Sequence, residues 1–325
     1  MPGTVVITGA AAGVGALRRG PLPRAAAASR CWHAARMDCT AGGQALVLPV
    51  DVADPDAIDA AASAAENGFG AIDIWLNVAM ATIFSPVHEI TPDEFRRATE
   101  VTYLGFVYGT MAALKRMRPR NHGTIVQVGS ALSYRAVPLQ SAHCGAKFAI
   151  RGFTQSLRSE LIHDGLDIHL TMVQLPAVNT PRFTWARNKM PCRPQPTPPI
   201  YQPEIVADAI VFGAYSRRRE VWVGWPTVKA ILATKLAPGL LDRYLALRGY
   251  TAQMADEPAD PRVPDNRFEP LPGDFGAHGG FDSHAADRCV QLWATRRRPE
   301  LLAAAMLVLV GLAAWLRPRI AENAG

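Results

Sequence analysis

The N-terminal residues constrain the fold of this chain more than any other segment. Residues 4–7 are β-branched and apolar, which predicts a short buried strand. The strand leads into a glycine-rich turn over residues 8–15. Glycines there allow the backbone to approach a pyrophosphate, which lies at the N-terminus of the following helix. We therefore predict a dinucleotide site, with a plain glycine-rich loop as the alternative. The candidate contacts are Thr8, Gly9, Gly13, Val14 and Gly15.

Further apolar runs alternate with helical segments along the chain. Residues 45–50, 72–77, 169–175 and 220–224 form short runs rich in the residues that strands prefer. Strands that alternate with helices predict a mostly parallel sheet with helices on both faces. The fold class we expect is therefore α/β, with a doubly wound sheet of the Rossmann type.

One helix start is well marked. Thr91 is an N-cap residue, Pro92 occupies the first helical position and Glu94 follows three residues after the cap. We expect this helix to run to about Arg118.

Three polar side chains suggest acid–base chemistry. Ser130 ends an apolar run, and His143 and Lys147 follow one helical turn apart, so both lie on one helix face. When a hydride joins or leaves a carbon, a proton must be exchanged at the attached oxygen, and a positioned side chain catalyses that exchange. The charge of Lys147 would keep a neighbouring imidazole neutral. Ser130 could hold the substrate oxygen by a hydrogen bond.

This pattern resembles the active site of the short-chain dehydrogenase/reductase family. In that family a strand-end Ser precedes a Tyr-x-x-x-Lys helix by the same spacing, and the Tyr exchanges the proton. His143 stands at the Tyr position. Its unperturbed pKa of about 6.5 replaces one of about 10. The imidazole is also shorter than a phenol, and a bridging water could restore the link. The alternative is that His143 is an ordinary helix residue beside an inactive site.

The resemblance extends to the cofactor half. The turn has the family's Thr-Gly-x-x-x-Gly-x-Gly spacing. The resemblance implies that Asp51, followed by Val52, contacts the adenine. Asn77 and Ala79 match the first Asn and the Ala of the family's Asn-Asn-Ala-Gly segment, whose other two positions differ here.

Two more family positions can be located. The resemblance places Thr102 where the family has the Asn of its catalytic tetrad, so two of the four tetrad positions are changed. Pro176 and Thr180 match a Pro-Gly-x-x-x-Thr turn that meets the nicotinamide amide, and Lys147 would also position the ribose. The apolar, proline-rich stretch that follows, residues 190–203, lies where the family has its substrate loop and indicates a lipophilic substrate.

Residues 16–40 do not fit the fold. No β-branched strand is visible there, and Pro21 and Pro23 would break the expected helix. The mixture of Arg, Ala, Pro and Cys resembles GC-rich DNA read out of frame, and we hypothesise a local frameshift, which resequencing would test. The residue that selects NAD or NADP normally ends the second strand. It cannot be located; Arg30 and Arg36 are candidates, with solvated side chains as the alternative.

Composition is that of an intracellular enzyme. The net charge of +6 is spread over 325 residues without a basic arm, so we expect no nucleic-acid partner. The five Cys show no metal-binding spacing and suit a reducing compartment, and the scattered His residues predict no metal site. No secretory signal precedes the first strand, so we expect a cytoplasmic protein.

The C-terminal tail is unlike the rest. Residues 301–316 carry no charge and are flanked by arginines on both sides. As a helix this run would span about 24 Å, against about 30 Å of hydrocarbon in a bilayer. It is a short candidate membrane anchor. The alternative is a helix that packs on the domain or on a second subunit of a homo-oligomer.

We therefore expect three parts: a catalytic domain over residues 1–225, an extension over 226–295 and a hydrophobic tail over 296–325. The resemblance implies hydride transfer between NAD or NADP, with the preference open, and an alcohol or carbonyl of a small lipophilic molecule. The alternative function is a catalytically impaired protein that binds a nucleotide or serves as a membrane-associated scaffold. The changes at His143 and Thr102 favour it, whereas the retained Ser130 and Lys147 favour the enzyme.

Overall fold

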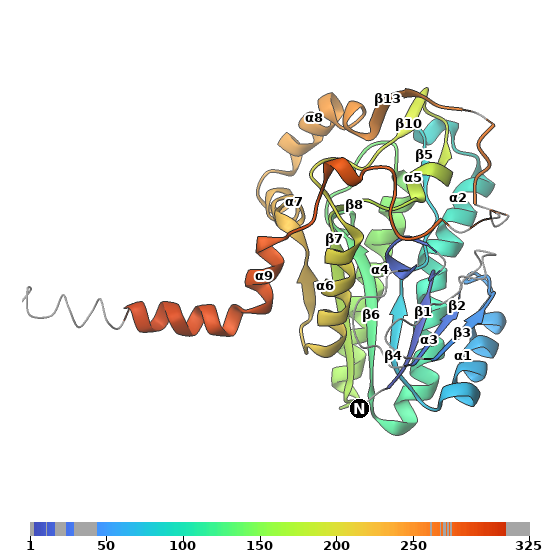
Figure 1. The fold of residues 1–325 in the computed structure, drawn as a ribbon, viewed down its shortest axis with the longest axis vertical. Helices are drawn as coiled ribbons and strands as arrows, with labels where there is room; N and C mark the ends of the chain where they lie inside the picture. Colours follow the sequence, from blue (N-terminus) through green and yellow to red (C-terminus); the bar gives the residue numbers. More distant parts are fainter. Residues whose placement is uncertain are drawn as a thin grey trace, which may run out of the picture.

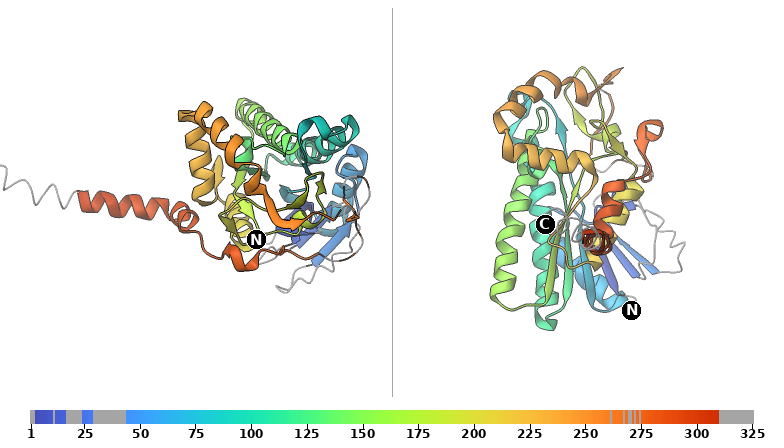
Figure 2. Two further views of the ribbon diagram at one scale, coloured as in Figure 1. Left: turned by 90° about the horizontal axis from the view of Figure 1, so that it is seen from above. Right: turned by 90° about the vertical axis from the view of Figure 1, so that its left-hand side faces the viewer.

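A central sheet covered by helices on both faces forms the body of the molecule (Figures 1 and 2). The computed structural model describes residues 3–10, 12–16, 24–28, 44–260, 262–266, 268, 271, 273 and 275–309.

Seven parallel strands form the sheet, in the order β12-β7-β6-β4-β1-β2-β3. The chain moves outward from β1 to β3 and then returns to β4 on the other side of β1. The order reverses there, and this is where doubly wound folds bind ligands, outside the carboxyl ends of the strands. The predicted parallel sheet is confirmed. The strands are β1 Thr4–Thr8, β2 Arg24–Ala28, β3 Gln44–Leu48, β4 Ile72–Asn77, β6 Gly123–Ser130, β7 Ile168–Leu175 and β12 Glu220–Trp222.

The second strand corrects one sequence expectation. We found no strand in residues 16–40 because that segment contains no β-branched run. The structure forms β2 from Arg24 and four alanines, paired in parallel with β1 and with β3. The backbone of β2 pairs with a strand on each side, and this pairing stabilises an extended conformation that the alanine side chains do not favour by themselves. Residues 17–23 and 29–43 lie outside the described residues, and so do Arg30 and Arg36.

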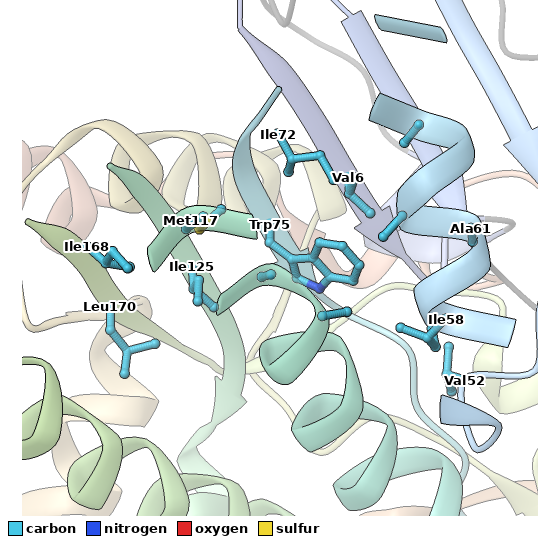
Figure 3. Close-up of a cluster of buried hydrophobic side chains, with 14 of the residues drawn as sticks. Val6, Val52, Ile58, Ala61, Ile72, Trp75, Met117, Ile125, Ile168 and Leu170 are labelled. Carbon is cyan, nitrogen blue, oxygen red and sulfur yellow. The ribbon is translucent and has the colours of Figure 1, made fainter. Parts of the chain in front are cut away.

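Helices cover the two faces of the sheet, and each face has its own apolar core. Helices α1 Pro55–Phe69, α3 Gly105–Met117 and α4 Ser141–His163 cover one face, with Trp75 fully buried beneath them (Figure 3). Helix α6 Pro203–Tyr215 covers the other. Val5 and Val6 enter opposite cores, as the alternation of side chains along a strand requires.

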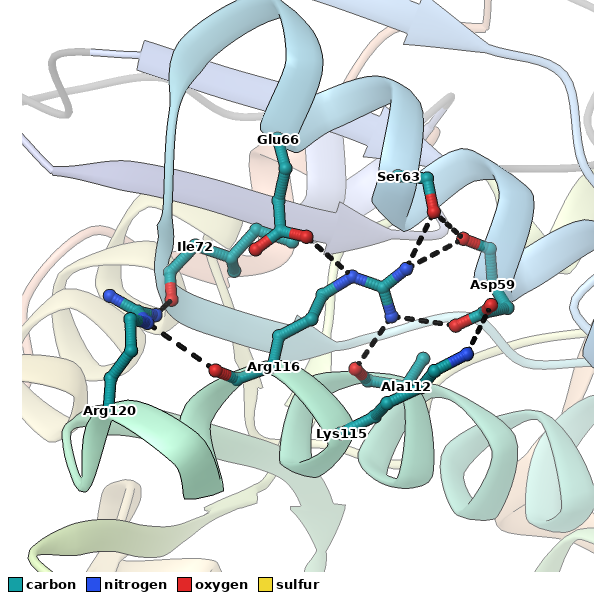
Figure 4. A network of polar contacts seen from close by, with 8 residues as sticks. All are labelled: Asp59, Ser63, Glu66, Ile72, Ala112, Lys115, Arg116 and Arg120. Atoms are coloured by element: carbon teal, nitrogen blue, oxygen red, sulfur yellow. Dashed lines mark hydrogen bonds and ion pairs between the residues drawn. The ribbon is translucent and has the colours of Figure 1, made fainter.

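A network of charged groups joins α1 to α3 (Figure 4). Arg116 donates to Asp59 at 2.7 Å and to Glu66 at 2.9 Å, and its side chain is only 8% exposed. The same guanidinium donates to Ser63 and to the carbonyl oxygen of Ala112. The network therefore ties α1, which packs against β1, β2 and β3, to α3, which packs against β4.

The helix predicted from Thr91 begins as expected but is not uniform. Thr91 and Glu94 form a capping box, and α2 runs over Pro92–Thr99. A π-helical segment, Glu100–Leu104, then joins α2 to α3, which ends at Met117. Such segments are frequent at functional sites. This one carries Thr102.

Most of the remaining elements build the upper part of the molecule in Figure 1, and α9 lies lower, where the tail leaves the body. Two helices follow β12, and Pro238 starts the second of them. The other elements are β5 Ile83–Phe84, β8 Ala177–Val178, α5 Arg182–Trp185, β9 Arg187–Asn188, β10 Cys192–Pro194, β11 Ile200–Tyr201, α7 Gly224–Leu236, α8 Pro238–Arg248, β13 Met254–Pro258, β14 Ala285–Ala286 and α9 Val290–Arg296.

The C-terminal tail helix leaves the body of the protein. Residues 298–309 are helical and extend away from the sheet (Figures 1 and 2). Their apolar side chains are exposed, among them Leu302, Leu307 and Val308. Within the part of the chain that the structure describes, which ends at residue 309, no helix has the length and apolarity to cross a membrane. Residues 310–316 of the candidate anchor lie outside that part.

Candidate active site

A cavity of about 450 Å³ lies at the carboxyl ends of the strands. It begins at the glycine-rich turn, where Gly9 and Gly13 line it, and continues to Ser130, His143 and Lys147. The sequence-predicted nucleotide turn and the predicted catalytic side chains therefore share one cavity.

The glycine-rich turn has the close packing that its sequence predicts. Gly9 has a φ of 73°, and a Cβ there would lie 2.6 Å from the Cα of Ala79. A Cβ on Gly15 would lie 2.3 Å from the carbonyl oxygen of Gly9. Only glycine fits at either position. Thr8 fixes the neighbouring turn, because its hydroxyl accepts hydrogen bonds from the backbone N–H groups of Val78 and Ala79.

This cradle fits a dinucleotide. Gly9, Gly13, Val14, Asp51, Val52 and Ala79 all line the same end of the cavity. The carboxylate of Asp51 accepts from Arg97 at 3.0 Å and from the backbone N–H of Ala53, so its position is fixed.

Asn77 has a different role from the one the resemblance implies. It is fully buried and does not line the cavity. Its carbonyl oxygen accepts from the indole N–H of Trp75 at 2.9 Å, and its amide donates to Thr110 and Gln127. Asn77 therefore ties β4 to β6 and α3 beneath the site.

A loop of the C-terminal extension closes over the glycine-rich turn. The carbonyl oxygen of Gly276 accepts a hydrogen bond from the backbone N–H of Gly13 at 2.9 Å. Asn179 holds the same loop by donating to Asp282 at 2.7 Å. His278 bridges Asp282 and Glu204, and the hydrogen bond to Asp282 is the main cause that raises the pKa of His278. No sequence pattern predicted that this extension would reach the nucleotide end.

The catalytic end is formed by the end of β6 and the first turns of α4. Ser130 Oγ accepts from the backbone N–H of Leu132 at 3.1 Å, which leaves its own hydrogen free to donate. Lys147 Nζ donates to the carbonyl oxygen of Val128 at 2.7 Å, and only 3% of the residue is exposed. His143 is 2% exposed, and its Nδ1 has no hydrogen-bond partner among the described residues.

Burial and charge shift both titrating groups in the same direction. Burial, and then the positive charge of Arg182, lowers the pKa of Lys147 to about 7. Burial is also the main cause that holds the pKa of His143 well below its usual value, followed by the charges of Arg182 and Lys147. At neutral pH the imidazole is therefore uncharged, and Lys147 exchanges protons readily.

The hydroxyl group of Thr102 forms hydrogen bonds within the fold. It donates to the carbonyl oxygen of Ala81 and accepts from the N–H of the same residue, both at 2.9 Å. Thr102 is fully buried and does not line the cavity within the described part of the chain. It holds the turn after β4, whereas an Asn there would offer an amide.

The loop after β7 completes the cavity. Pro176 and Thr180 line it, as the resemblance implies, and Arg182 at the start of α5 lines it as well. Sequence reasoning missed Arg182. The only available signal was its place two residues after Thr180, which does not distinguish a cavity residue from a solvated one.

Comparisons with known proteins agree with this geometry. Residues 3–190 match the family described as short chain dehydrogenase. An "Uncharacterized oxidoreductase YxnA" of Bacillus subtilis (strain 168) is 30% identical over 96% of this chain and 89% of its own length. The "3-dehydrosphinganine reductase" of Danio rerio is 30% identical over 51% of each chain. A short-chain dehydrogenase structure from Streptomyces avermitilis is similar in fold, with a TM-score of 0.61 at 22% identity, over 76% of this chain and 99% of that one.

Proposed function

Because this chain belongs to the short-chain dehydrogenase family and is an oxidoreductase of that type, we propose that it transfers a hydride between a nicotinamide dinucleotide, NAD or NADP, and an alcohol or carbonyl of a small lipophilic molecule. One observation carries this proposal: the glycine-rich turn and the triplet Ser130, His143 and Lys147 line the same cavity.

The chain's own residues have separable roles in this reaction. When bound, the dinucleotide supplies or accepts the hydride. Ser130 donates its hydroxyl hydrogen to the substrate oxygen and holds it in place. Lys147, whose pKa of about 7 lies near working pH, is the group best suited to exchange the proton, directly or through the neutral imidazole of His143. Gly9 and Gly13 let the backbone approach the nucleotide.

The cavity wall supports a lipophilic substrate. Apolar side chains from three separate segments line the cavity around the catalytic end. They include Leu132, Val137, Phe183, Trp185, Leu241 and Leu245. Such a wall excludes water from the reacting atoms and favours burial of an apolar body. One relative bears the name of a reductase, which is consistent with a carbonyl substrate.

A panel of alcohols and ketones, each tested with NAD(H) and NADP(H), tests the function through the absorbance of the reduced nicotinamide. We expect turnover with at least one apolar ketone or alcohol. Ser130→Ala should reduce it strongly, and Arg193→Met, an exposed residue outside the cavity lining, serves as the control.

The second candidate is a nucleotide-binding protein with impaired chemistry. The enclosed imidazole of His143 and the structural contact of Thr102 favour it. Tight nucleotide binding in calorimetry without turnover of any panel member would favour this candidate over the enzyme. In either case we propose that the apolar tail, residues 301–316, associates with a membrane or with a second copy of the chain.

A further inference from the structure

Arg182 brings a second positive charge to the catalytic end of the cavity. It is the first residue of α5, and its side chain lines the cavity together with His143 and Lys147. The guanidinium carbon lies 4.6 Å from the centre of the Phe183 ring, and Nη1 lies 3.6 Å from the sulfur of Met80. Arg182 is half-buried, and an aromatic ring and a thioether sulfur provide only weak compensation for a charge that is partly removed from water.

The other arginines of the cavity wall are paired. Arg97 donates to Asp51, and Arg135 donates to Asp242. Arg116 and Arg187, which lie elsewhere in the fold, also have carboxylate partners. Among the residues that the structure describes, no Asp or Glu pairs with Arg182 or with Lys147. The only carboxylate in the described cavity lining is that of Asp51.

A charged guanidinium and a lysine with a pKa of about 7 therefore line the catalytic end of the cavity, and neither has a carboxylate partner among the described residues. Isolated buried charges are costly, so such groups are normally paired or reserved for a ligand. The positive charge of Arg182 reaches both catalytic groups, since it lowers the pKa of Lys147 and of His143. Burial lowers the pKa of Arg182 itself only to about 10, so the guanidinium stays charged at neutral pH.

We propose that Arg182 binds an anionic group, a carboxylate or phosphate, that the substrate carries next to its reacting carbon. This assignment rests on the proposed function and narrows its substrate class to an amphipathic molecule with an apolar body and an anionic end. The planar guanidinium can donate two parallel hydrogen bonds to such a group. The apolar wall formed by residues such as Leu132 and Trp185 would enclose the rest of the molecule.

A matched pair of ligands tests the proposal. 2-Oxo-octanoate and 2-octanone have the same chain and carbonyl, and differ in a carboxylate that replaces a methyl group. Binding of each to the full chain is measured by calorimetry in the presence of oxidised nucleotide, which cannot reduce either carbonyl. We expect the wild type to bind the acid roughly 10- to 100-fold more tightly, as charge-assisted hydrogen bonds allow.

Variants assign the preference to the residue. Arg182→Met should abolish the preference for the acid and leave the affinity for 2-octanone within about threefold, whereas Arg182→Lys, which keeps a point charge, should retain part of it. Arg187→Met is the matched control, because Arg187 lies outside the described cavity lining and is expected to leave the preference intact. Thermal melts followed by circular dichroism establish that each variant is folded.

Three results would overturn the proposal. They are equal affinity of the wild type for acid and ketone, a preference that persists in Arg182→Met, and a loss in Arg182→Met that is confined to NAD(H) or NADP(H) binding. The last would assign the arginine to a phosphate of the cofactor.

The proposed function and the anion site can fail separately. A confirmed preference for the acid without turnover of any alcohol or carbonyl would reject the proposed function and keep the anion site. Turnover of neutral ketones without a preference for the acid would do the reverse.

Discussion

Replacing His143 with tyrosine should increase turnover. The residue is 2% exposed and its imidazole is uncharged, so it is poorly suited to donate a proton to the substrate oxygen. The side chain is also shorter than that of tyrosine. A phenol reaches further, and its normal pKa of about 10 would be lowered by the positive charges of Lys147 and Arg182, while burial would oppose that shift. One positioned acid–base group contributes about 10²- to 10⁴-fold, or about 2.7–5.4 kcal/mol of barrier. We expect an increase in kcat within that range.

The assay is steady-state reduction of a carbonyl that calorimetry has shown to bind. His143→Phe is the matched control, because it keeps an aromatic ring of similar size but carries no proton to exchange. It should give no increase. If His143→Tyr binds nucleotide and substrate and still shows no gain, the reasoning is refuted, and Thr102 would be the larger defect.

Four further predictions concern charge and the tail. Lys147→Ala should weaken nucleotide binding as well as activity, and unchanged affinity in calorimetry would contradict both roles of the lysine. In the wild type, kcat/KM for carbonyl reduction should fall as pH rises through about 7, because Lys147 then loses the proton it must donate. Arg116→Met should lower the free energy of unfolding in urea by roughly 1.5–3 kcal/mol, since the carboxylate of Asp59 loses a partner but remains partly solvated. The full chain should sediment with membranes, and a chain ending at Thr295 should stay in the supernatant. The anchor would be rejected if the full chain stays in the supernatant and the shortened chain is less soluble than the full chain.

The sheet could be predicted because its signals are local. Val5 and Val6 are apolar neighbours that enter two different cores, which is what a buried parallel strand requires. Strand β2 could not be predicted, because alanine has no strand preference and only the partners on either side select the extended conformation. The π-helical segment that carries Thr102 was equally invisible, since its hydrogen-bonding pattern leaves no sequence period of its own.

The site could be predicted only where a family motif marked it. Ser130, His143 and Lys147 line one cavity, and their catalytic roles stay a prediction. Arg182 was missed because it stands out only by having no carboxylate partner among the described residues. No sequence pattern shows which arginines are paired in the fold. Asn77 was assigned to the nucleotide from its match alone, yet its amide is used inside the fold.

The two departures from the family pattern are linked through one backbone unit. Thr102 binds both the N–H and the carbonyl oxygen of Ala81. The backbone of the same residue also acts on His143, where it partly opposes the lowering of the imidazole pKa. Thr102 thus fixes the turn after β4, and the backbone of that turn influences the imidazole of His143. Because both residues share this backbone unit, a change at one alters the surroundings of the other, and their effects should not add. The tetrad of this chain is therefore better understood as one rearranged unit than as two independent losses.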